Sequence, residues 1–390
     1  MPHLRNRHIY TSIAKRQALW PVLGILGPRQ VGKSTLLRDQ LCAAQTTAKY
    51  FSFDVRDIRE RAERQPDYYL KSLTSDAAPV IIDEVQKVPE IFDAIKANVD
   101  EERRPGKFII SGSTEFSQKT GIRESLTGRI GLLRLFPLTL SEANRRTFCD
   151  PFVSHDFRVT STPSEFERWL TTGGMPSHCF LRSEDERNAS WSAWIDTVCF
   201  RDLAQFKALR LDGDLARDIL ESVPRLEEAT LPVIAAKLKV DARKVKRHIE
   251  ALAALFLLQE IKPHSAGTGK SEWQLWDTGF SQMMGATQLN RLRTLCMNEC
   301  LAQHEYAGKG LPRLFYFKSA KGARADLISE TKSGVSAYIL SEDSTLSPYL
   351  SRTVASVKRH LPACKIFIIA PVSECFEEWG ATIVPWTAIG

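Results

Sequence analysis

The segment Gly27-Pro28-Arg29-Gln30-Val31-Gly32-Lys33-Ser34-Thr35 constrains the fold of this chain more than any other feature. It follows the apolar run Val22–Leu26 and precedes a helical pattern with leucines at positions 36, 37 and 41. A strand, a glycine loop and a helix in this order direct backbone N–H groups and the positive end of a helix dipole to one point, which suits phosphate. The segment therefore predicts a phosphate-binding α/β domain.

Two further apolar runs end in polar residues, as parallel strands at a ligand site do. Residues 79–82 are followed by Asp83-Glu84, and residues 107–110 by Ser111-Gly112-Ser113. The carboxyl ends of parallel strands share one edge of a sheet, where ligands bind. A strand-end carboxylate pair is also compatible with a solvated cap.

The site residues have distinct expected roles. Lys33 is expected to contact the β- and γ-phosphates of ATP, with Ser34 and Asp83 as ligands of Mg²⁺. Glu84 is expected to activate a water molecule. Ser113 is a candidate sensor of the γ-phosphate or, equally, a helix cap.

Two arginines are candidates for a finger inserted by a neighbouring subunit. Arg129 lies in Leu126-Thr127-Gly128-Arg129, and Arg123 precedes it. Such a finger offsets transition-state charge and would require a homo-oligomer. The alternative is that each arginine is simply solvated.

Length and composition limit the remaining choices. The chain has 390 residues, which indicates two or three domains, and its formal charge of +7 tolerates nucleic acid without requiring it. The eight cysteines form no Cys-x-x-Cys pair, and scattered cysteines favour a reducing compartment. No stretch is apolar enough to span a membrane. We expect a cytoplasmic protein.

Several motifs together resemble one family. They are Gly27 to Ser34, Phe53-Asp54, Ile82-Asp83-Glu84-Val85-Gln86, Ile110-Ser111-Gly112-Ser113, and Glu124 to Arg129 followed by Phe136-Pro137-Leu138. This series resembles the AAA-type ATPases that carry a C-terminal DUF4143 region. Gly173-Gly174-Met175-Pro176, Arg201-Asp202-Leu203 and Trp276-Asp277-Thr278-Gly279 resemble markers of that region.

The resemblance implies a particular architecture. A P-loop NTPase domain of the AAA type, with a parallel sheet between helices, is expected over residues 1–145. A helical linker or lid would follow over 146–214, a winged helix-turn-helix over 215–285, and a small α/β domain similar to PD-(D/E)xK nucleases over 286–390. The resemblance adds architecture and names no substrate.

A basic helix lies within the expected winged helix. Residues 230–256 give two apolar stripes around the turn Lys239-Val240-Asp241, with Asp241 as the N-cap of the second helix. Its opposite face carries Arg243, Lys244, Lys246 and Arg247, where a DNA phosphate backbone could bind. A hairpin over 258–276 fits a wing. Such modules also serve as lids or protein-docking sites, and both readings stay open.

The nuclease-like part lacks its expected catalytic strand. Asp326 and Glu299 suit two of the acidic positions, but residues 335–341 contain no Glu-x-Lys. Glu330-Thr331-Lys332 matches that pattern literally, although Ser333-Gly334 places it at a turn. We therefore expect a catalytically degenerate domain. An active metal-dependent nuclease is the less favoured alternative.

The sequence as a whole favours an ATP-binding and ATP-hydrolysing protein whose nucleotide state is coupled to the winged-helix and nuclease-like module. A nucleotide-gated module with negligible hydrolysis, which holds DNA or a protein partner, is the rival hypothesis.

Overall fold

The structure is a computed structural model that describes residues 4–44, 47–74, 78–113, 126–206 and 209–390. The chain forms two compact units. Residues 1–136, 254–256 and 305–309 make up the first, and the remaining residues make up the second. Arg123, one of the two finger candidates, lies outside the described residues.

A five-stranded parallel sheet is the centre of the first unit, with strand order β2-β3-β4-β1-β5. Its strands are β1 (Val22–Leu26), β2 (Lys49–Ser52), β3 (Val80–Asp83), β4 (Phe108–Gly112) and β5 (Ile130–Arg134). β1, β3 and β4 are buried at every position. Apart from Asp83 at the end of β3 and Ser111 in β4 their side chains are apolar or absent, so these strands show no alternation of polar and apolar residues. The predicted α/β fold with a parallel sheet is confirmed.

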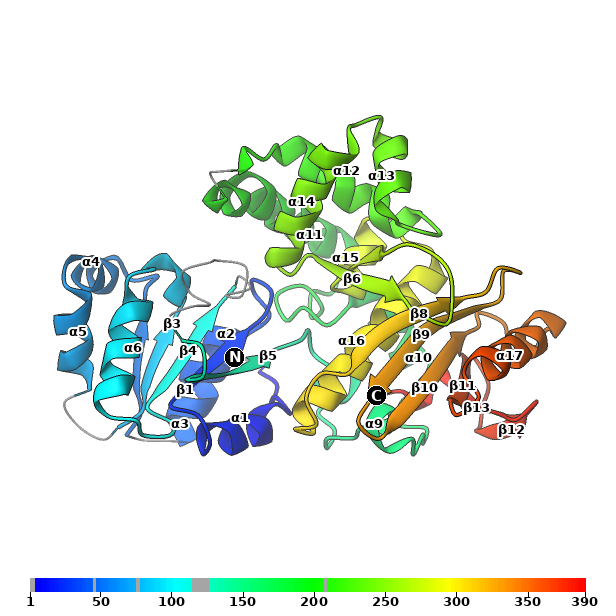
Figure 1. Ribbon diagram of the computed structural model, residues 1–390, viewed down its shortest axis with the longest axis horizontal. Helices are drawn as coiled ribbons and strands as arrows, with labels where there is room; N and C mark the ends of the chain where they lie inside the picture. The colour runs from blue at the N-terminus through cyan, green and yellow to red at the C-terminus, as the bar shows by residue number, and fades with distance from the viewer. Residues whose placement is uncertain (1–3, 45–46, 75–77, 114–125, 207–208) are drawn as a thin grey trace. The chain divides into compact units, whose positions relative to one another are not determined.

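Helices flank this sheet, and α5 packs against both α4 and α6 (Figure 1). The helix that follows the glycine loop begins as α2 and continues through a π-helical stretch, Leu36–Leu41, into α3. The helices are α1 (Tyr10–Gln17), α2 (Lys33–Thr35), α3 (Cys42–Ala44), α4 (Arg56–Arg64), α5 (Pro66–Leu73) and α6 (Ile91–Glu101).

The second unit contains a mixed eight-stranded sheet with strand order β12-β13-β11-β10-β9-β8-β6-β7. The strands are β6 (Leu258–Pro263), β7 (Glu272–Leu275), β8 (Arg313–Lys318), β9 (Arg324–Thr331), β10 (Gly334–Leu340), β11 (Lys365–Ala370), β12 (Phe376–Glu378) and β13 (Ala381–Pro385). Leu350, Val354 and Val357 of helix α17 (Pro348–His360) pack into the apolar core of this sheet. The hairpin predicted over 258–276 is present as antiparallel β6 and β7, and it shares one sheet with β8 to β13.

Helices make up much of the rest of this unit (Figure 1). They are α8 (Leu140–Ala143), α9 (Pro151–Ser154), α10 (Pro163–Thr172), α11 (Glu184–Asp196), α12 (Gly213–Ser222), α13 (Leu231–Leu238), α14 (Ala242–Ala254), α15 (Thr278–Met283), α16 (Gln288–Tyr306) and α17 (Pro348–His360). The last residues of α16 belong to the first unit. Capping boxes at Thr139, Thr162 and Ser183 fix where α8, α10 and α11 begin.

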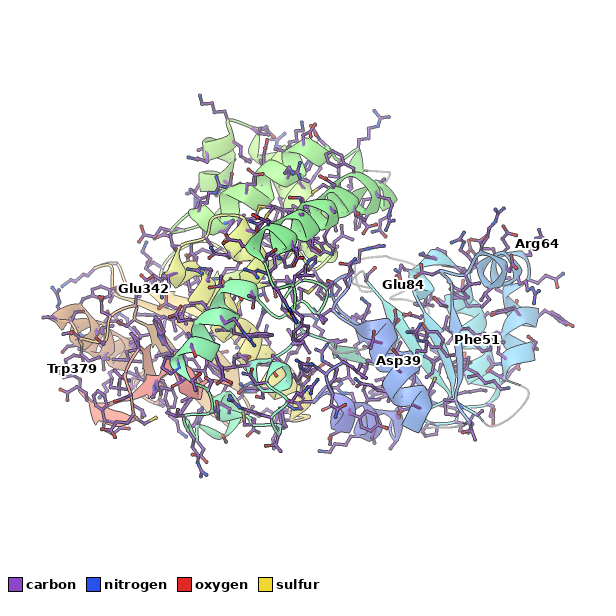
Figure 2. All side chains as sticks on the ribbon, turned by 180° about the vertical axis from the view of Figure 1, so that it is seen from behind. Asp39, Phe51, Arg64, Glu84, Glu342 and Trp379 are labelled. Carbon is purple, nitrogen blue, oxygen red and sulfur yellow. The ribbon has the colours of Figure 1, made fainter. Side chains whose placement is uncertain are left out.

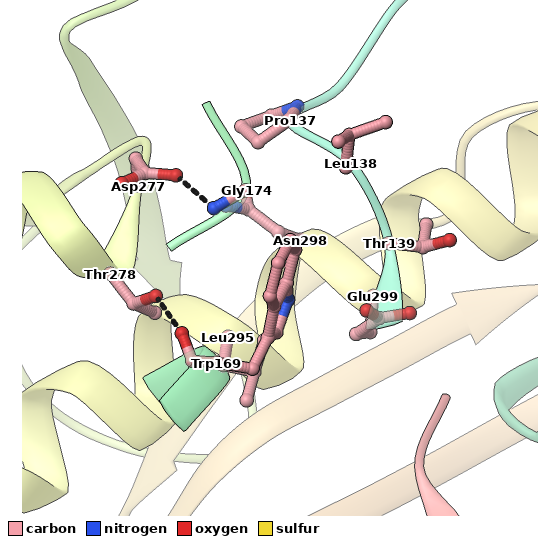
Figure 3. A pocket seen from close by; sticks show the side chains of 10 residues that line it. All are labelled: Pro137, Leu138, Thr139, Trp169, Gly174, Asp277, Thr278, Leu295, Asn298 and Glu299. Atoms are coloured by element: carbon pink, nitrogen blue, oxygen red, sulfur yellow. Dashed lines mark hydrogen bonds between the residues drawn. The ribbon is translucent and has the colours of Figure 1, made fainter. Parts of the chain in front are cut away.

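Hydrogen bonds connect two sequence motifs of the second unit, Gly173-Gly174-Met175-Pro176 and Trp276-Asp277-Thr278-Gly279. The Asp277 carboxylate accepts hydrogen bonds from the backbone N–H groups of Gly174 (2.7 Å), Met175 (3.1 Å) and Phe280 (3.0 Å). A Cβ atom on Gly173 would lie 2.1 Å from Asp277 Oδ1, so no larger residue fits there. Asp277 also lines a cavity of about 10 Å³, which is room for one water molecule (Figure 3). Gly-Gly-Met-Pro and Trp-Asp-Thr-Gly therefore have a structural reason to occur together.

Candidate active site

The glycine loop lies between β1 and α2 at the carboxyl edge of the parallel sheet. A Cβ atom on Gly27 would lie 2.4 Å from the carbonyl oxygen of Leu135, so this position admits only glycine. Gly32 has a φ of +100°, which glycine adopts without strain, and it is the N-cap residue directly before α2. Val31 is fully buried beneath the loop, whereas Arg29 and Gln30 are at least partly exposed.

Lys33 is held inside this loop. Its ammonium group donates to the carbonyl oxygens of Gly27 (2.9 Å) and Pro28 (2.8 Å), and the side chain is 4% exposed. Burial lowers the pKa of Lys33, and the charges of Glu84 and Asp83 act in the opposite direction. Both carboxylates therefore lie close enough to Lys33 to interact with it electrostatically.

Asp83 ends β3 and is almost fully buried. Its Oδ2 atom accepts a hydrogen bond of 2.7 Å from the Tyr50 hydroxyl on β2, and its Oδ1 atom accepts from the Ser111 hydroxyl on β4 and from the Glu84 N–H group. Burial, followed by the charge of Asp83, raises the pKa of Tyr50 well above its usual range, so Tyr50 keeps the proton that it donates. The neighbouring strands thus fix the orientation of the carboxylate.

Glu84 forms a hydrogen-bonded cluster with Gln86 and Ser113. Its backbone is left-handed, with φ of +56°, at the residue that follows β3 (Glu84 is labelled in Figure 2). Gln86 Nε2 donates to Glu84 Oε2 and to Ser113 Oγ (3.2 Å), and Ser113 Oγ lies 3.4 Å from Glu84 Oε2. Gln86 Oε1 is buried and has no hydrogen-bond partner among the residues that the structure describes. The Glu84 carboxylate is therefore bonded to a side chain, Gln86, whose Oε1 atom can still accept a hydrogen bond.

The structure brings Lys33, Asp83, Glu84 and Ser113 to one edge of the sheet, and Ser34 and Thr35 begin the helix there. Sequence reasoning assigned no role to Tyr50, Ser111 or Gln86. Gln86 and Ser111 stood within quoted motifs, but nothing marked Tyr50, because its partner lies 33 residues away in sequence.

Arg129 lies at the opposite edge of the same sheet. It immediately precedes β5, which runs parallel to β1, and its carbonyl oxygen accepts from the N–H group of Val22 at the start of β1. Its guanidinium group forms a two-bond ion pair with Asp100 (2.7 and 2.8 Å). Arg129 therefore does not reach the glycine loop of its own chain.

The basic residues of α14 belong to the second unit. Arg243, Lys246 and Arg247 are exposed, and Lys244 is half-buried and lies 3.5 Å from Asp212. Asp241 Oδ1 accepts from the N–H groups of Arg243 (2.9 Å) and Lys244 (3.3 Å), which confirms its predicted capping role. The opposite face of α14 is buried through Val245, Ile249 and Leu252.

The carboxylates that the sequence suggested for a nuclease-like site form hydrogen bonds or ion pairs with other groups of the chain. Asp326 Oδ1 lies 2.8 Å from Arg293 Nε, and Asp326 Oδ2 accepts from the Leu340 N–H group (2.9 Å). Glu299 accepts from the N–H group of Leu140 (2.7 Å), and burial raises its pKa to about 7. Glu330 is the second-last residue of β9, directly before the turn into β10.

The donor set near Lys33 fits magnesium bound together with a nucleotide. Within the described parts of the chain, no cluster of three or more His, Cys, Asp and Glu side chains is placed to hold a metal ion. A site with one hydroxyl, from Ser34, and one carboxylate, from Asp83, suits Mg²⁺, which takes its other ligands from phosphate and water. No helix in the described ranges has the length and apolarity that a bilayer crossing needs.

The chain is similar to known protein families over two separate ranges. Residues 20–144 match the model of an AAA domain family, and residues 163–285 match a domain of unknown function, DUF8612. Uncharacterized proteins of Mycobacterium bovis and Mycobacterium tuberculosis are each 26% identical over 364 residues, which cover 90% of this chain and 76% of theirs. Among solved structures, the Walker-type ATPase of Pyrococcus abyssi is similar at 15% identity and a TM-score of 0.45, over 72% of this chain and 96% of that one.

The first unit thus has the fold of a P-loop NTPase. The residues that match the AAA domain model include the glycine loop, Asp83 at the end of β3 and Glu84 after it. Residues 163–285 match DUF8612, whereas the sequence analysis predicted a DUF4143 region. The resemblance to DUF4143 therefore stays a prediction.

Proposed function

We propose that this protein binds ATP with Mg²⁺ at residues 27–35 and hydrolyses it. The observation that carries the proposal is the Glu84 cluster beside the buried Lys33 and Asp83. When ATP binds, the Lys33 ammonium group donates to phosphate oxygens in place of the carbonyl oxygens of Gly27 and Pro28. Backbone N–H groups from Gly27 to Thr35 surround the phosphates. Bound Mg²⁺, held by Ser34 and Asp83, would neutralise phosphate charge.

In the proposed reaction, Glu84 accepts a proton from the water that attacks the γ-phosphorus, and the bond from that phosphorus to the β–γ bridging oxygen breaks. Gln86 Nε2 holds the carboxylate of Glu84. Gln86 Oε1, which has no partner within the described part of the chain, is an acceptor for the second hydrogen of the same water. Ser113 completes the cluster from the end of β4.

The test is Mg²⁺-dependent phosphate release by the wild type, Lys33→Ala and Glu84→Gln, together with ATP affinity. Glu84→Gln is expected to lower turnover by about a hundredfold or more while ATP still binds. Lys33→Ala is expected to weaken ATP binding itself. Unchanged affinity in Lys33→Ala would show that the phosphates lie elsewhere.

We further propose that the second unit is the output module of this ATPase. The domain divisions at 146–214, 215–285 and 286–390 remain part of this proposal, with α12 to α14 and the β6–β7 hairpin as a winged helix. Support comes from the capped α14 and from the hairpin that follows it. Arg293 beside Asp326 supports a degenerate nuclease-like region, because a guanidinium group stands where a catalytic cation would bind.

DNA is the partner that α14 would favour, since its exposed face carries three cations. The hairpin tip is tied to the C-terminal sheet, because Thr268 N–H donates to Lys318 O (2.8 Å) and the Tyr316 hydroxyl to Lys270 O (2.8 Å). Contacts would therefore come from α14 and not from a free wing.

A charge-reversal pair tests the DNA proposal. Arg243→Glu/Arg247→Glu is expected to abolish duplex binding at low salt, whereas Arg352→Glu/Arg359→Glu, which changes the same charge on exposed positions of α17, is expected to retain it. Equal binding by both double variants would favour the rival proposal, a protein-docking switch.

A further inference from the structure

A cavity of about 560 Å³ lies in the first unit among β2, α4 and α5. Phe51, Ile58 and Leu73 contribute apolar walls. β3 and β4 lie between β2, which borders the cavity, and β1, which leads into the glycine loop. Three strand spacings therefore separate β2 from β1, which is about 14 Å. The volume of the cavity falls in the range of small-molecule sites.

The arginines of α4 divide into two pairs with different surroundings. Arg56 and Arg59 point to acidic partners one turn away, Glu60 (2.6 Å) and Glu63 (3.8 Å). Arg61 and Arg64 line the cavity, and neither guanidinium group has a carboxylate within 4 Å or a hydrogen-bond partner among the described residues. The cavity therefore carries two guanidinium groups that are available to a ligand (Figure 2 labels Arg64 and Phe51).

Tyr69 adds a third donor to the same cavity. Its hydroxyl group is buried and has no hydrogen-bond partner within the described chain. Burial raises the pKa of Tyr69 to about 12, and the nearby charge of Arg61 acts in the opposite direction, so the hydroxyl stays protonated at neutral pH. A buried donor without an acceptor is unfavourable, and a bound ligand acceptor would satisfy it.

Aromatic rings surround these donors. Tyr69 packs edge to face on Phe51, with ring centroids 6.5 Å apart, and the highly exposed Tyr68 stands at the rim. Flat ligands pack well against such rings, and guanidinium groups bind carboxylates and phosphates through paired N–H groups.

We infer that this cavity binds a small aromatic anion. The ring lies against Phe51 and the tyrosines, the anionic group contacts Arg61 and Arg64, and the Tyr69 hydroxyl donates to a ligand acceptor. A nucleoside monophosphate and an aromatic carboxylate share this chemistry, so the experiment includes both.

The experiment measures calorimetric binding of AMP and of indole-3-carboxylate to the full chain carrying Lys33→Ala, which separates the cavity from the glycine loop. Arg61→Ala/Arg64→Ala is expected to weaken binding by about tenfold or more, since two charge-assisted contacts are lost. The matched control Arg56→Ala/Arg59→Ala removes equal charge from the same helix and is expected to change affinity by less than about twofold.

Tyr69→Phe provides a second, milder test, because it removes one oxygen atom and keeps the ring packing. Its affinity is expected to fall by about three- to tenfold. Binding of either probe with this pattern supports the inference and identifies the source of the ligand. Failure of both probes to bind, or equal weakening by the two arginine pairs, overturns it and leaves the ATPase proposal untouched.

Discussion

The hydroxyl of Tyr50 donates a 2.7 Å hydrogen bond to Asp83 Oδ2, so the carboxylate that ends β3 is oriented from the neighbouring strand β2. Groups that orient a metal ligand tune its affinity for the metal, typically by about ten- to a hundredfold. Tyr50→Phe is therefore expected to raise the Mg²⁺ concentration needed for half-maximal hydrolysis. The measurement is a Mg²⁺ titration at saturating ATP, with the exposed Tyr68→Phe as control. An unchanged Mg²⁺ requirement in Tyr50→Phe would remove its assigned role.

Gln86 is expected to act on turnover and not on nucleotide binding. Gln86→Ala removes both the donor to Glu84 and the buried acceptor, so hydrolysis should fall by about tenfold or more while the Kd for ATP stays constant. Gln86→Glu places a second carboxylate beside Glu84 and should move the acid limb of the pH–rate profile to higher pH. A purely structural role would leave that limb in place.

His178 is expected to make the second unit acid-labile. Its ring stacks on Trp191 with centroids 3.8 Å apart, Nδ1 lies 2.8 Å from the Ser190 hydroxyl, and burial lowers its pKa from 6.5 to about 4. The unfolded chain therefore binds more protons than the folded chain between pH 4 and 6.5. Stability from neutral His178 is fully present above about pH 6.5 and falls by about 3 kcal/mol as the pH drops toward 4.

Urea unfolding followed by tryptophan fluorescence at pH 7 and pH 4.5 measures this loss. His178→Phe keeps the ring stack and should reduce the loss, whereas His360→Phe at an exposed position should not. The same pH dependence in all three proteins would contradict the assignment to His178.

Asp277 is expected to be essential for the integrity of the second unit. Asp277→Ala deletes the acceptor of three backbone N–H groups and is expected to lower the free energy of unfolding by about 2–4 kcal/mol. Chemical denaturation tests this expectation, with Asp343→Ala at an exposed turn as the control. A loss below about 0.5 kcal/mol would show that the two motifs are not joined through Asp277.

The sequence was informative where the signal is local. The strand, glycine loop and helix around Lys33 follow from contiguous residues, and so does the hairpin of β6 and β7. Contacts between distant segments were not predictable, because a single sequence contains no record of which residues meet. Three examples are the hydrogen bond from Tyr50 to Asp83, the pairing of β6 with β8, and the hydrogen bonds that Gly174 and Met175 donate to Asp277.

The most direct test of the central claim is Mg²⁺-dependent ATP hydrolysis by the purified full chain and by Glu84→Gln, measured with ATP affinity in the same preparations. The proposed mechanism predicts steady phosphate release by the wild type, its loss in Glu84→Gln, and comparable ATP affinity in both. ATP binding by the wild type without phosphate release, or undiminished release by Glu84→Gln, would contradict it.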